Sequence, residues 1–240
     1  MTKLDILVLP VHPDDAELGC AGTILKHIAA GKKVGIVDLT RGELGTRGSA
    51  EIRAQEAEAA AEILGLTLRD NLGLPDGFFQ NTQEYQLKVI EVIRKYQPEI
   101  IITNAHYDRH PDHGRASDLV ETSTFLSGLR KIETYFEGEL QQAWRPNLLL
   151  HFIQDQYIQP NIVVDVTDYW DKKIESVMAY GSQFYNPEWK GEPQTYISSP
   201  EFIKIIDGRG LEFGKSIKVK YAEGFTSKKI FGVDSLFDLR

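Results

Sequence analysis

Hydrophobic residues in the first hundred positions alternate between short continuous runs and helically spaced sets. The continuous runs at 4–11 and 99–105 predict buried strands, and we expect two further strands at 33–39 and 66–72. Between these runs, apolar residues recur every three or four positions, which predicts helices over 16–30, 49–65 and 83–96. Strands that alternate with helices indicate a parallel sheet covered by helices on both faces and joined by right-handed crossovers.

The second half of the chain is less regular. We expect helices over 113–129, from about 167 to 179, and over 200–214. Two apolar runs, 147–153 and 162–166, predict strands, and 184–198 is rich in Pro, Gly and aromatic residues, which indicates a long loop. No repeat or linker interrupts the chain. We therefore predict one domain over 1–240, with a Rossmann-like three-layer α/β/α fold and a mostly parallel sheet.

Composition narrows the classes of partner. The chain has 42% hydrophobic and 26% charged residues, as globular proteins do, and its net charge is −8. General nucleic-acid binders are usually basic, so we expect no nucleic-acid partner. No apolar run is long enough to span a bilayer, so we expect no membrane partner. The single cysteine, Cys20, fits a reducing compartment, and we expect a cytoplasmic protein.

The first polar cluster, His12-Pro13-Asp14-Asp15-Ala16-Glu17, follows directly after the first predicted strand. In open α/β sheets, ligands bind at the carboxyl ends of the strands. Imidazole nitrogen and carboxylate oxygen are ligands for Zn²⁺, and His12 and Asp15 could converge on one ion across a strand-to-helix turn. The alternative interpretation is structural: Asp14 or Asp15 caps the following helix, and His12 is a surface residue.

The second polar cluster, 106–113, follows the fourth predicted strand. Its eight residues include three histidines and the two aspartates Asp108 and Asp112. Two clusters at one edge of one sheet predict a site with His12, Asp15 and one histidine of the second cluster as ligands. Three protein ligands and an open position are the arrangement of catalytic zinc. Spacing alone leaves the choice among His106, His110 and His113 open.

These motifs carry a family resemblance. HPDDAE at 12–17, HPDH at 110–113, TRGELG at 40–45 and Arg53 resemble the PIG-L-type zinc-dependent de-N-acetylases. YDRHPDH at 107–113, SQF at 182–184 and YAEGFTSKK at 221–229 are similar to the branch of that family that deacetylates N-acetylglucosaminyl malate in bacillithiol biosynthesis. The resemblance spans nearly the whole chain.

The resemblance also implies roles for individual residues. It implies a zinc site whose ligands are His12, Asp15 and His113. It implies Asp14 as general base, His110 as the residue that stabilises the oxyanion, and Asp112 as a neighbour that tunes a histidine. It further implies a homo-oligomer. Fe²⁺ is the alternative metal, because imidazole and carboxylate ligands suit both ions.

The activity implied is hydrolysis of the N-acetyl group of an N-acetylglucosaminide by metal-activated water. We hypothesise that His110 acts in its charged form, so that activity falls at high pH. Four residues are candidates for binding the amino-sugar substrate: Glu43, Arg47, Arg53 and Arg109. The alternatives are a deacetylase of another N-acetylglucosamine-containing sugar, a non-catalytic metal-dependent sugar-binding protein, and a nucleotide-binding domain. The last is disfavoured because the glycine fingerprint is missing.

Overall fold

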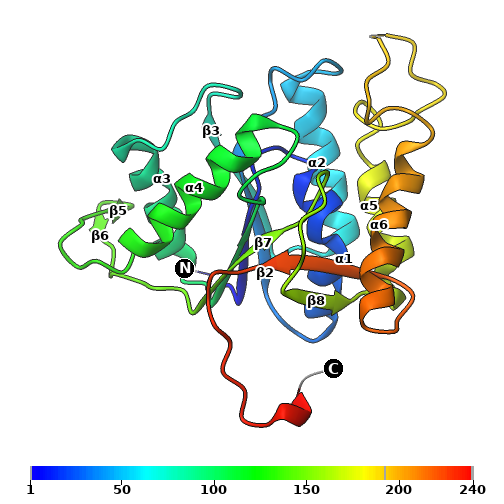
Figure 1. The fold of residues 1–240 in the computed structure, drawn as a ribbon. Coiled ribbons are helices and arrows are strands. Elements are labelled where there is room, and N and C mark those ends of the chain that lie inside the picture. Colours follow the sequence, from blue (N-terminus) through cyan, green and yellow to red (C-terminus); the bar gives the residue numbers. More distant parts are fainter. Residues whose placement is uncertain (1, 192, 239–240) are drawn as a thin grey trace.

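A seven-stranded sheet forms the centre of the molecule in the computed structural model, which describes residues 2–191 and 193–238 (Figure 1). Its strands are β1 Ile6–Leu9, β2 Val34–Thr40, β3 Leu68–Leu74, β4 Ile100–Thr103, β7 Leu148–Phe152, β8 Ile162–Asp165 and β9 Ala222–Thr226. Their spatial order is β3-β2-β1-β4-β7-β9-β8. All pairings from β3 to β7 are parallel, whereas β9 runs antiparallel to both β7 and β8. The predicted mostly parallel sheet is confirmed.

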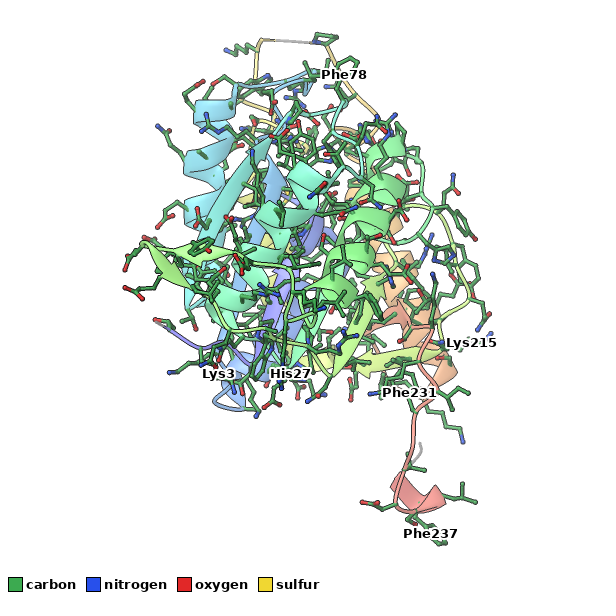
Figure 2. All side chains as sticks on the ribbon, turned by 90° about the vertical axis from the view of Figure 1, so that its left-hand side faces the viewer. Lys3, His27, Phe78, Lys215, Phe231 and Phe237 are labelled. Atoms are coloured by element: carbon green, nitrogen blue, oxygen red, sulfur yellow. The ribbon has the colours of Figure 1, made fainter. Side chains whose placement is uncertain are left out.

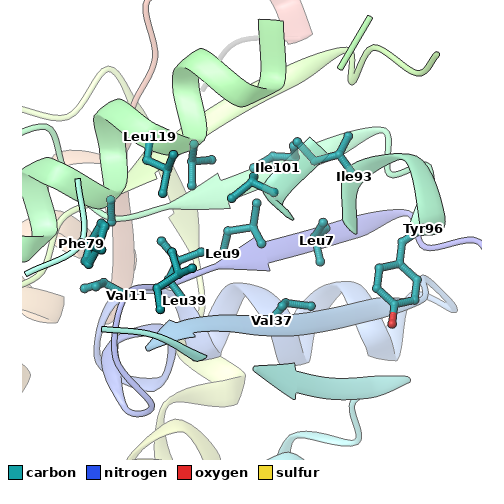
Figure 3. Close-up of a cluster of buried hydrophobic side chains, with 14 of the residues drawn as sticks. Leu7, Leu9, Val11, Val37, Leu39, Phe79, Ile93, Tyr96, Ile101 and Leu119 are labelled. Atoms are coloured by element: carbon teal, nitrogen blue, oxygen red, sulfur yellow. The ribbon is translucent and has the colours of Figure 1, made fainter. Parts of the chain in front are cut away.

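Helices cover both faces of this sheet (Figure 1). The helices are α1 Asp15–Ala29, α2 Ala50–Leu64, α3 Gln83–Tyr96, α4 Pro111–Leu126, α5 Trp170–Met178 and α6 Phe202–Ser216. On one face, α3 and α4 pack on side chains of the central strands, including Leu7, Leu9 and Ile101 (Figure 3). On the other face, α1 packs on Ile6, Val8 and their neighbours. The predicted three-layer architecture is therefore confirmed.

The central strands are largely apolar because both of their faces are covered. Every residue of β1 and β2 is buried. The helix boundaries follow local capping chemistry. The hydroxyl of Ser49 accepts a hydrogen bond from the backbone N–H of Ile52 at the start of α2, and Gly65 ends that helix in the left-handed conformation.

Helix α1 is broken in the middle, at Cys20, whose φ of −149° is not helical. The break leaves backbone groups without partners inside the helix, and side chains from elsewhere in the chain supply them. Glu223 on β9 accepts hydrogen bonds from the N–H groups of Gly22 and Thr23. Lys173 on α5 donates to the carbonyl of Leu18 and to Glu223, at 2.7 and 2.6 Å. This buried ion pair therefore holds the two halves of α1 together.

Several predicted boundaries are wrong by a few residues. The strand expected at 66–72 lies at Leu68–Leu74, and the helix expected from 113 begins at Pro111. Strand β9 and the hairpin formed by β5 (Tyr135–Phe136) and β6 (Glu139–Leu140) were not expected from the sequence. These strands are short: β5 and β6 have only two residues each, and β9 is defined by its pairing with the distant β7 and β8.

Residues after β9 leave the body of the molecule and lead to a short 3₁₀ helix, Leu236–Asp238 (Figure 1). Among the helices of the described residues, none combines the length and the apolar character that a membrane span requires.

Candidate metal centre and its cavity

The two polar clusters meet at the carboxyl edge of the sheet, as predicted. The first lies between the end of β1 and the start of α1, and the second between the end of β4 and the start of α4. Because β1 and β4 are adjacent and parallel, their carboxyl ends lie side by side. His12, Asp14, Asp15, His110 and His113 all line one cavity there.

Asp15 lies between two imidazoles. Its Oδ2 is 3.5 Å from Nδ1 of His12, and its Oδ1 is 3.3 Å from Nε2 of His113. Three donors hold the carboxylate in place: the backbone N–H of His12, the side-chain amide of Asn104 and that of Gln154, at 2.7–3.1 Å. The structure therefore brings together the three residues to which the family resemblance assigns the metal.

A second carboxylate stands behind each of these imidazoles. His12 Nε2 lies 2.9 Å from Oδ1 of Asp76, and His113 Nδ1 lies 2.8 Å from Oδ2 of Asp108. Metal-binding histidines typically pair their other nitrogen with a carboxylate, which fixes the tautomer and aims the free nitrogen at the metal. The arrangement thus leaves Nδ1 of His12 and Nε2 of His113 facing Asp15. Sequence reasoning assigned no role to either Asp76 or Asp108.

Buried charge at this centre fits a divalent cation. Burial alone would raise the pKa of Asp15, but His113 and His12 outweigh it and hold that pKa well below its usual range. Burial opposes charging of His113, yet Asp15 and Asp108 raise its pKa to about 9. Asp15 is therefore anionic, the form that binds metal. Among the described residues, the His/Asp groups whose ligand atoms all lie within 4.8 Å of one another are His12–His110–His113 and His12–Asp76–Asp112.

The carboxylates of the second of those groups, like that of Asp15, accept hydrogen bonds from other donors. Asp112 accepts hydrogen bonds from the backbone N–H of Gly77 and from the guanidinium of Arg115, both at 2.7 Å. Asp76 accepts from the backbone N–H of Leu44. Burial would raise the pKa of Asp112, but the nearby His12 imidazole and the hydrogen bond from Gly77 lower it to about 2. Asp112 lies 3.8 Å from Nε2 of His12, so the imidazole that its carboxylate contacts is that of His12.

Asp14 has a strained backbone, with φ at +124°, and its side chain lies beside the metal centre rather than between the imidazoles. Its Oδ2 accepts a hydrogen bond from Nη2 of Arg53 at 3.0 Å, whereas Oδ1 receives none from any described residue. Burial raises the pKa of Asp14 to about 7, although the charge of Arg53 pulls it down. A buried carboxylate with a pKa near neutrality and a free oxygen on the cavity is suited to accept a proton.

His110 begins α4, and its Nδ1 accepts a hydrogen bond from the backbone N–H of Asp112 at 3.3 Å. Burial, together with the charges of His12 and His113, lowers the pKa of His110. The structure therefore argues against the charged His110 that we hypothesised from the sequence. A neutral ring that accepts at Nδ1 carries its proton on Nε2, and it remains a hydrogen-bond donor.

The cavity has a volume of about 440 Å³ and two kinds of wall. One wall is polar and contains Arg47, Arg53 and Arg109 together with the metal centre. The other is formed by the inner face of α6 and by its neighbours, and its main apolar side chains are Ile153, Trp170, Phe202, Ile205, Ile206 and Phe213. A polar end and an apolar wall are typical of a small-molecule site.

The candidate substrate residues differ in what they contact. Arg53 donates to Asp14 and to Gln183 Oε1, and the exposed Arg109 pairs with Asp155 at 3.0 Å. Glu43 is not among the residues that line the cavity. Its Oε1 accepts a hydrogen bond from the backbone N–H of Asp76 and thereby positions the turn that contains Asp76.

Arg47 differs from the other arginines of the cavity. It is only 6% exposed, and its Nε has no hydrogen-bond partner. Within the described part of the chain its guanidinium forms no ion pair, and it lies 5.3 Å from the centre of the Trp189 ring. Burial of an unpaired cation is unfavourable, so a site of this kind favours an anionic ligand.

Gln183, from the loop after α5, was noted in the sequence only as part of SQF. Its amide donates to the carbonyl of Arg47, and its Oε1 accepts from Arg53. Gln183 thus links the second half of the chain to both arginines. Gln183 lies more than a hundred residues from both arginines in the chain, so the sequence alone could not predict these two contacts.

Comparisons with known proteins found a matching family model and a similar solved structure. Residues 7–123 match the family model PIG-L, described as GlcNAc-PI de-N-acetylase. The crystal structure of the conserved protein TT1542 from Thermus thermophilus superposes with a TM-score of 0.84 at 36% identity, covering 96% of this chain and 98% of that one.

The names of the relatives state different substrates. Diacetylchitobiose deacetylase of Thermococcus kodakarensis is 29% identical over 91% of this chain and 81% of its own length. A probable N-acetyl-α-D-glucosaminyl L-malate deacetylase 2 of Bacillus anthracis is 28% identical over 75% and 81%. 4-Oxalmesaconate hydratase of Pseudomonas putida is 25% identical over 92% and 88%.

Proposed function

The chain belongs to the PIG-L family of de-N-acetylases, and we propose that its hydrolytic activity removes the acetyl group of N-acetylglucosaminyl malate in the cytoplasm. The support for this substrate is the Bacillus anthracis relative and, above all, Arg47, which forms no ion pair with the described residues. The malate part carries two carboxylates, and a guanidinium binds a carboxylate through two parallel hydrogen bonds. Diacetylchitobiose, the substrate named for the Thermococcus relative, has no charge to offer this arginine.

Zn²⁺ is the metal that we propose, with His12, Asp15 and His113 as its ligands. Imidazole nitrogen and carboxylate oxygen are common zinc ligands, and Fe²⁺ is the alternative because the same donors suit it. A divalent ion held there would polarise the amide carbonyl and acidify a water molecule. The chain's own residues perform the remaining steps.

Asp14 acts as the general base. Its free Oδ1 accepts the proton of the water that attacks the amide carbon, while Arg53 holds the other oxygen in place. The same carboxyl then returns the proton to the amine that leaves. A pKa near 7 suits both steps, since the group must bind and release a proton at neutral pH.

His110 donates a hydrogen bond from Nε2 to the oxygen on which negative charge develops. Its ring lies edge-on to His12, with centroids 4.7 Å apart, so it adjoins the proposed metal centre. One donor of this kind contributes about 3 kcal/mol to stabilisation of the transition state. Asp112 acts on this arrangement through His12 and through the start of α4.

The test is acetate release from three substrates: N-acetylglucosaminyl malate, diacetylchitobiose and free N-acetylglucosamine. The protein is stripped of metal and then loaded with Zn²⁺ or Fe²⁺. We expect metal-dependent release that is fastest with the malate glycoside. Equal turnover of all three would contradict the malate assignment. Absence of acetate under every condition would point to hydration chemistry, as in the Pseudomonas relative, or to binding alone.

Variants of two arginines sharpen the substrate assignment. Arg47→Met should lower kcat/KM for the malate glycoside about 10- to 100-fold, the loss expected for a charge-assisted hydrogen bond, and should leave diacetylchitobiose turnover unchanged. Arg109→Met is the matched control, because this exposed arginine already pairs with Asp155. A similar loss on both substrates in Arg47→Met would contradict recognition of a carboxylate.

A further inference from the structure

The cavity beside the metal centre extends along one helix, and the proposed reaction leaves that part of it without a role. We define the α6 wall as the apolar and glycine residues of α6 that line the cavity: Phe202, Ile205, Ile206, Gly210 and Phe213. Spacings of three and four residues place them on one face of the helix. Lys215, in the last turn of α6, lies well below Phe78, which follows the cavity residue Gly77 (Figure 2). The α6 wall therefore leads away from the end of the molecule at which Phe78 lies.

Both ends of the α6 wall pack on the body of the protein, in separate apolar clusters. Phe202 packs with Tyr180 and Phe184, whereas Phe213 packs with Ile153 and Ile158. Between these two ends the wall lines the cavity. Because packing anchors both ends, the wall presents a fixed apolar surface to whatever occupies the cavity.

Apolar surface continues from the metal centre to the α6 wall. Ile153, which packs with the wall, is followed in the chain by Gln154, whose amide donates to Oδ1 of Asp15. Leu18, three residues after Asp15, lines the same cavity and packs on the cluster that contains Phe202. An apolar group that begins at the metal centre can therefore continue along the wall without crossing a polar surface.

Charged side chains near the α6 wall are already hydrogen-bonded within the protein. Lys173 donates to Glu223 and to a backbone carbonyl, and Arg209 donates to two backbone carbonyls. At the polar wall, by contrast, the Nε of Arg47 has no partner among the described residues. The cavity therefore favours an anion at one end and a hydrocarbon at the other, because apolar surface is covered most favourably by an apolar group.

The substituents of a bound amide select one occupant for the α6 wall. In the proposed reaction the carbonyl oxygen faces the metal and His110, and the nitrogen carries the sugar. Arg47 attracts the malate carboxylates, so the sugar and its malate lie toward the polar wall. The acyl chain is the remaining substituent, and the α6 wall is the remaining surface. This step rests on the proposed function.

We propose that the α6 wall is a subsite for the acyl chain, and that the protein hydrolyses N-butanoyl, N-hexanoyl and N-octanoyl glucosaminides with a higher kcat/KM than N-acetyl ones. The bond changes are those of the acetyl reaction. The oxygen of water bonds to the acyl carbon, the C–N bond breaks, and the nitrogen takes a proton and leaves as the amine. The products are a glucosaminide and a straight-chain carboxylate. An acetyl group leaves most of the wall uncovered, whereas a longer chain covers it.

A chain-length series on the zinc-loaded protein tests the subsite. The acetyl, butanoyl and hexanoyl amides of glucosaminyl malate are compared, and kcat/KM should rise by about 4-fold for each methylene that the wall buries. A flat or falling series would overturn the proposal. The same series on the methyl glycoside separates this proposal from the malate assignment: an equal rise without any preference for malate would support the subsite and contradict the malate.

A second pair of substrates tests which substituent occupies the wall. One carries an N-hexanoyl group on a methyl glycoside, and the other an N-acetyl group on a hexyl glycoside. We expect the N-hexanoyl compound to have the higher kcat/KM. A higher value for the hexyl glycoside would overturn the proposal, because it would place the aglycone on the α6 wall.

Two matched variants of α6 test the wall itself. Ile205 and Leu211 are 45% and 47% exposed, and of the two Ile205 lines the cavity. Ile205→Asp should lower the ratio of octanoyl to acetyl kcat/KM by about 10-fold, because a carboxylate beside the chain must lose water. Leu211→Asp should keep the wild-type ratio. Equal ratios in the two variants would overturn the proposal.

Binding of the carboxylate products gives a readout that does not depend on turnover. Calorimetry of the zinc-loaded protein should show that octanoate binds more tightly than acetate, and that Ile205→Asp loses this difference while Leu211→Asp keeps it. Equal affinities of the wild type for octanoate and acetate would overturn the acyl-chain subsite, whatever the sugar that the enzyme prefers.

Discussion

Two buried charged clusters, one at the start of α1 and one at the break in its middle, both line the cavity and yet are organised in opposite ways. In the Lys173–Glu223 pair, both carboxylate oxygens of Glu223 accept hydrogen bonds, and Lys173 donates to a backbone carbonyl as well as to Glu223. In the metal centre, Asp14 keeps one oxygen without a hydrogen bond from the described residues, and its backbone is strained.

The difference separates a structural cluster from a reactive one. A buried ion pair whose groups are all hydrogen-bonded can hold backbone in place, whereas loss of one member is costly. A cluster that contains a carboxylate oxygen without a donor, and imidazole nitrogens that converge on the same place, is arranged to bind a ligand. Variants of the first cluster should therefore change stability, and variants of the second should change chemistry.

The largest expected effect on chemistry is that of Asp14→Asn. Loss of the general base should lower kcat by about 10²- to 10⁴-fold, since the amide cannot accept the proton of the attacking water. Metal content, measured by atomic emission, should stay at the wild-type level because Asp14 is not a proposed ligand. Loss of metal together with activity would place Asp14 among the ligands instead.

The largest expected effect on stability is that of Lys173→Met. It leaves the Glu223 carboxylate buried without its cation and should lower the free energy of unfolding by about 3–5 kcal/mol. Urea titration measures this change, and kcat of the folded fraction should remain close to wild type. Lys173→Met/Glu223→Gln is the control: removal of the orphaned charge should restore part of the stability. A double variant less stable than Lys173→Met would contradict the charge argument.

Smaller effects are expected from the carboxylates behind the imidazoles. Asp76→Asn and Asp108→Asn should each weaken metal affinity by about 10- to 100-fold, the usual range for such partners of metal-bound histidines. Competition with a chromophoric chelator measures the affinity. Asp38→Asn is the control, because Asp38 is a buried carboxylate that pairs with Arg69 instead of an imidazole. Wild-type affinity in both Asp76→Asn and Asp108→Asn would contradict the assigned ligand atoms.

The smallest expected effect is a shift in pH dependence. Asp14 must be ionised to accept a proton, so kcat/KM should rise with pH through the pKa of Asp14. Arg53 lowers that pKa, and Arg53→Met should therefore move the acidic limb of the pH profile to higher pH. Arg53→Lys keeps a positive charge and should move it less. A limb that stays in place, or moves to lower pH, would contradict Asp14 as the base.

Motif spacing predicted those parts of the site that local sequence encodes. His12, Asp14 and Asp15 follow one strand, and His110 and His113 follow its neighbour, so sheet topology brings them together. Asp76 could not be predicted, because it reaches His12 across 64 residues from a turn with no distinguishing pattern. The same holds for Gln183, which contacts Arg53 across 130 residues.

Fold prediction succeeded and failed for related reasons. Continuous apolar runs identified β1 and β4, because a strand covered on both faces must be apolar. The edge strand β3, with the sequence LRDNLGL, is only partly buried. Strand β9, with the sequence AEGFT, has no such run, and its glutamate faces α1. Its place in the sheet depends on pairing with β7 and β8. The burial of the Glu223 carboxylate is explained by the break in α1, because the backbone N–H groups exposed there donate to it.

The break in α1 has a consequence for how the chain is made. The amides of Gly22 and Thr23 find their acceptor 201 and 200 residues later, in Glu223. A ribosome that adds about 5–20 residues per second takes roughly 10–40 s to cover that distance. During that interval Glu223 has not been synthesised, so the middle turn of α1 lacks its hydrogen-bond acceptor. The start of α1, which carries Asp15 of the proposed metal centre, therefore reaches its final structure only near the end of synthesis.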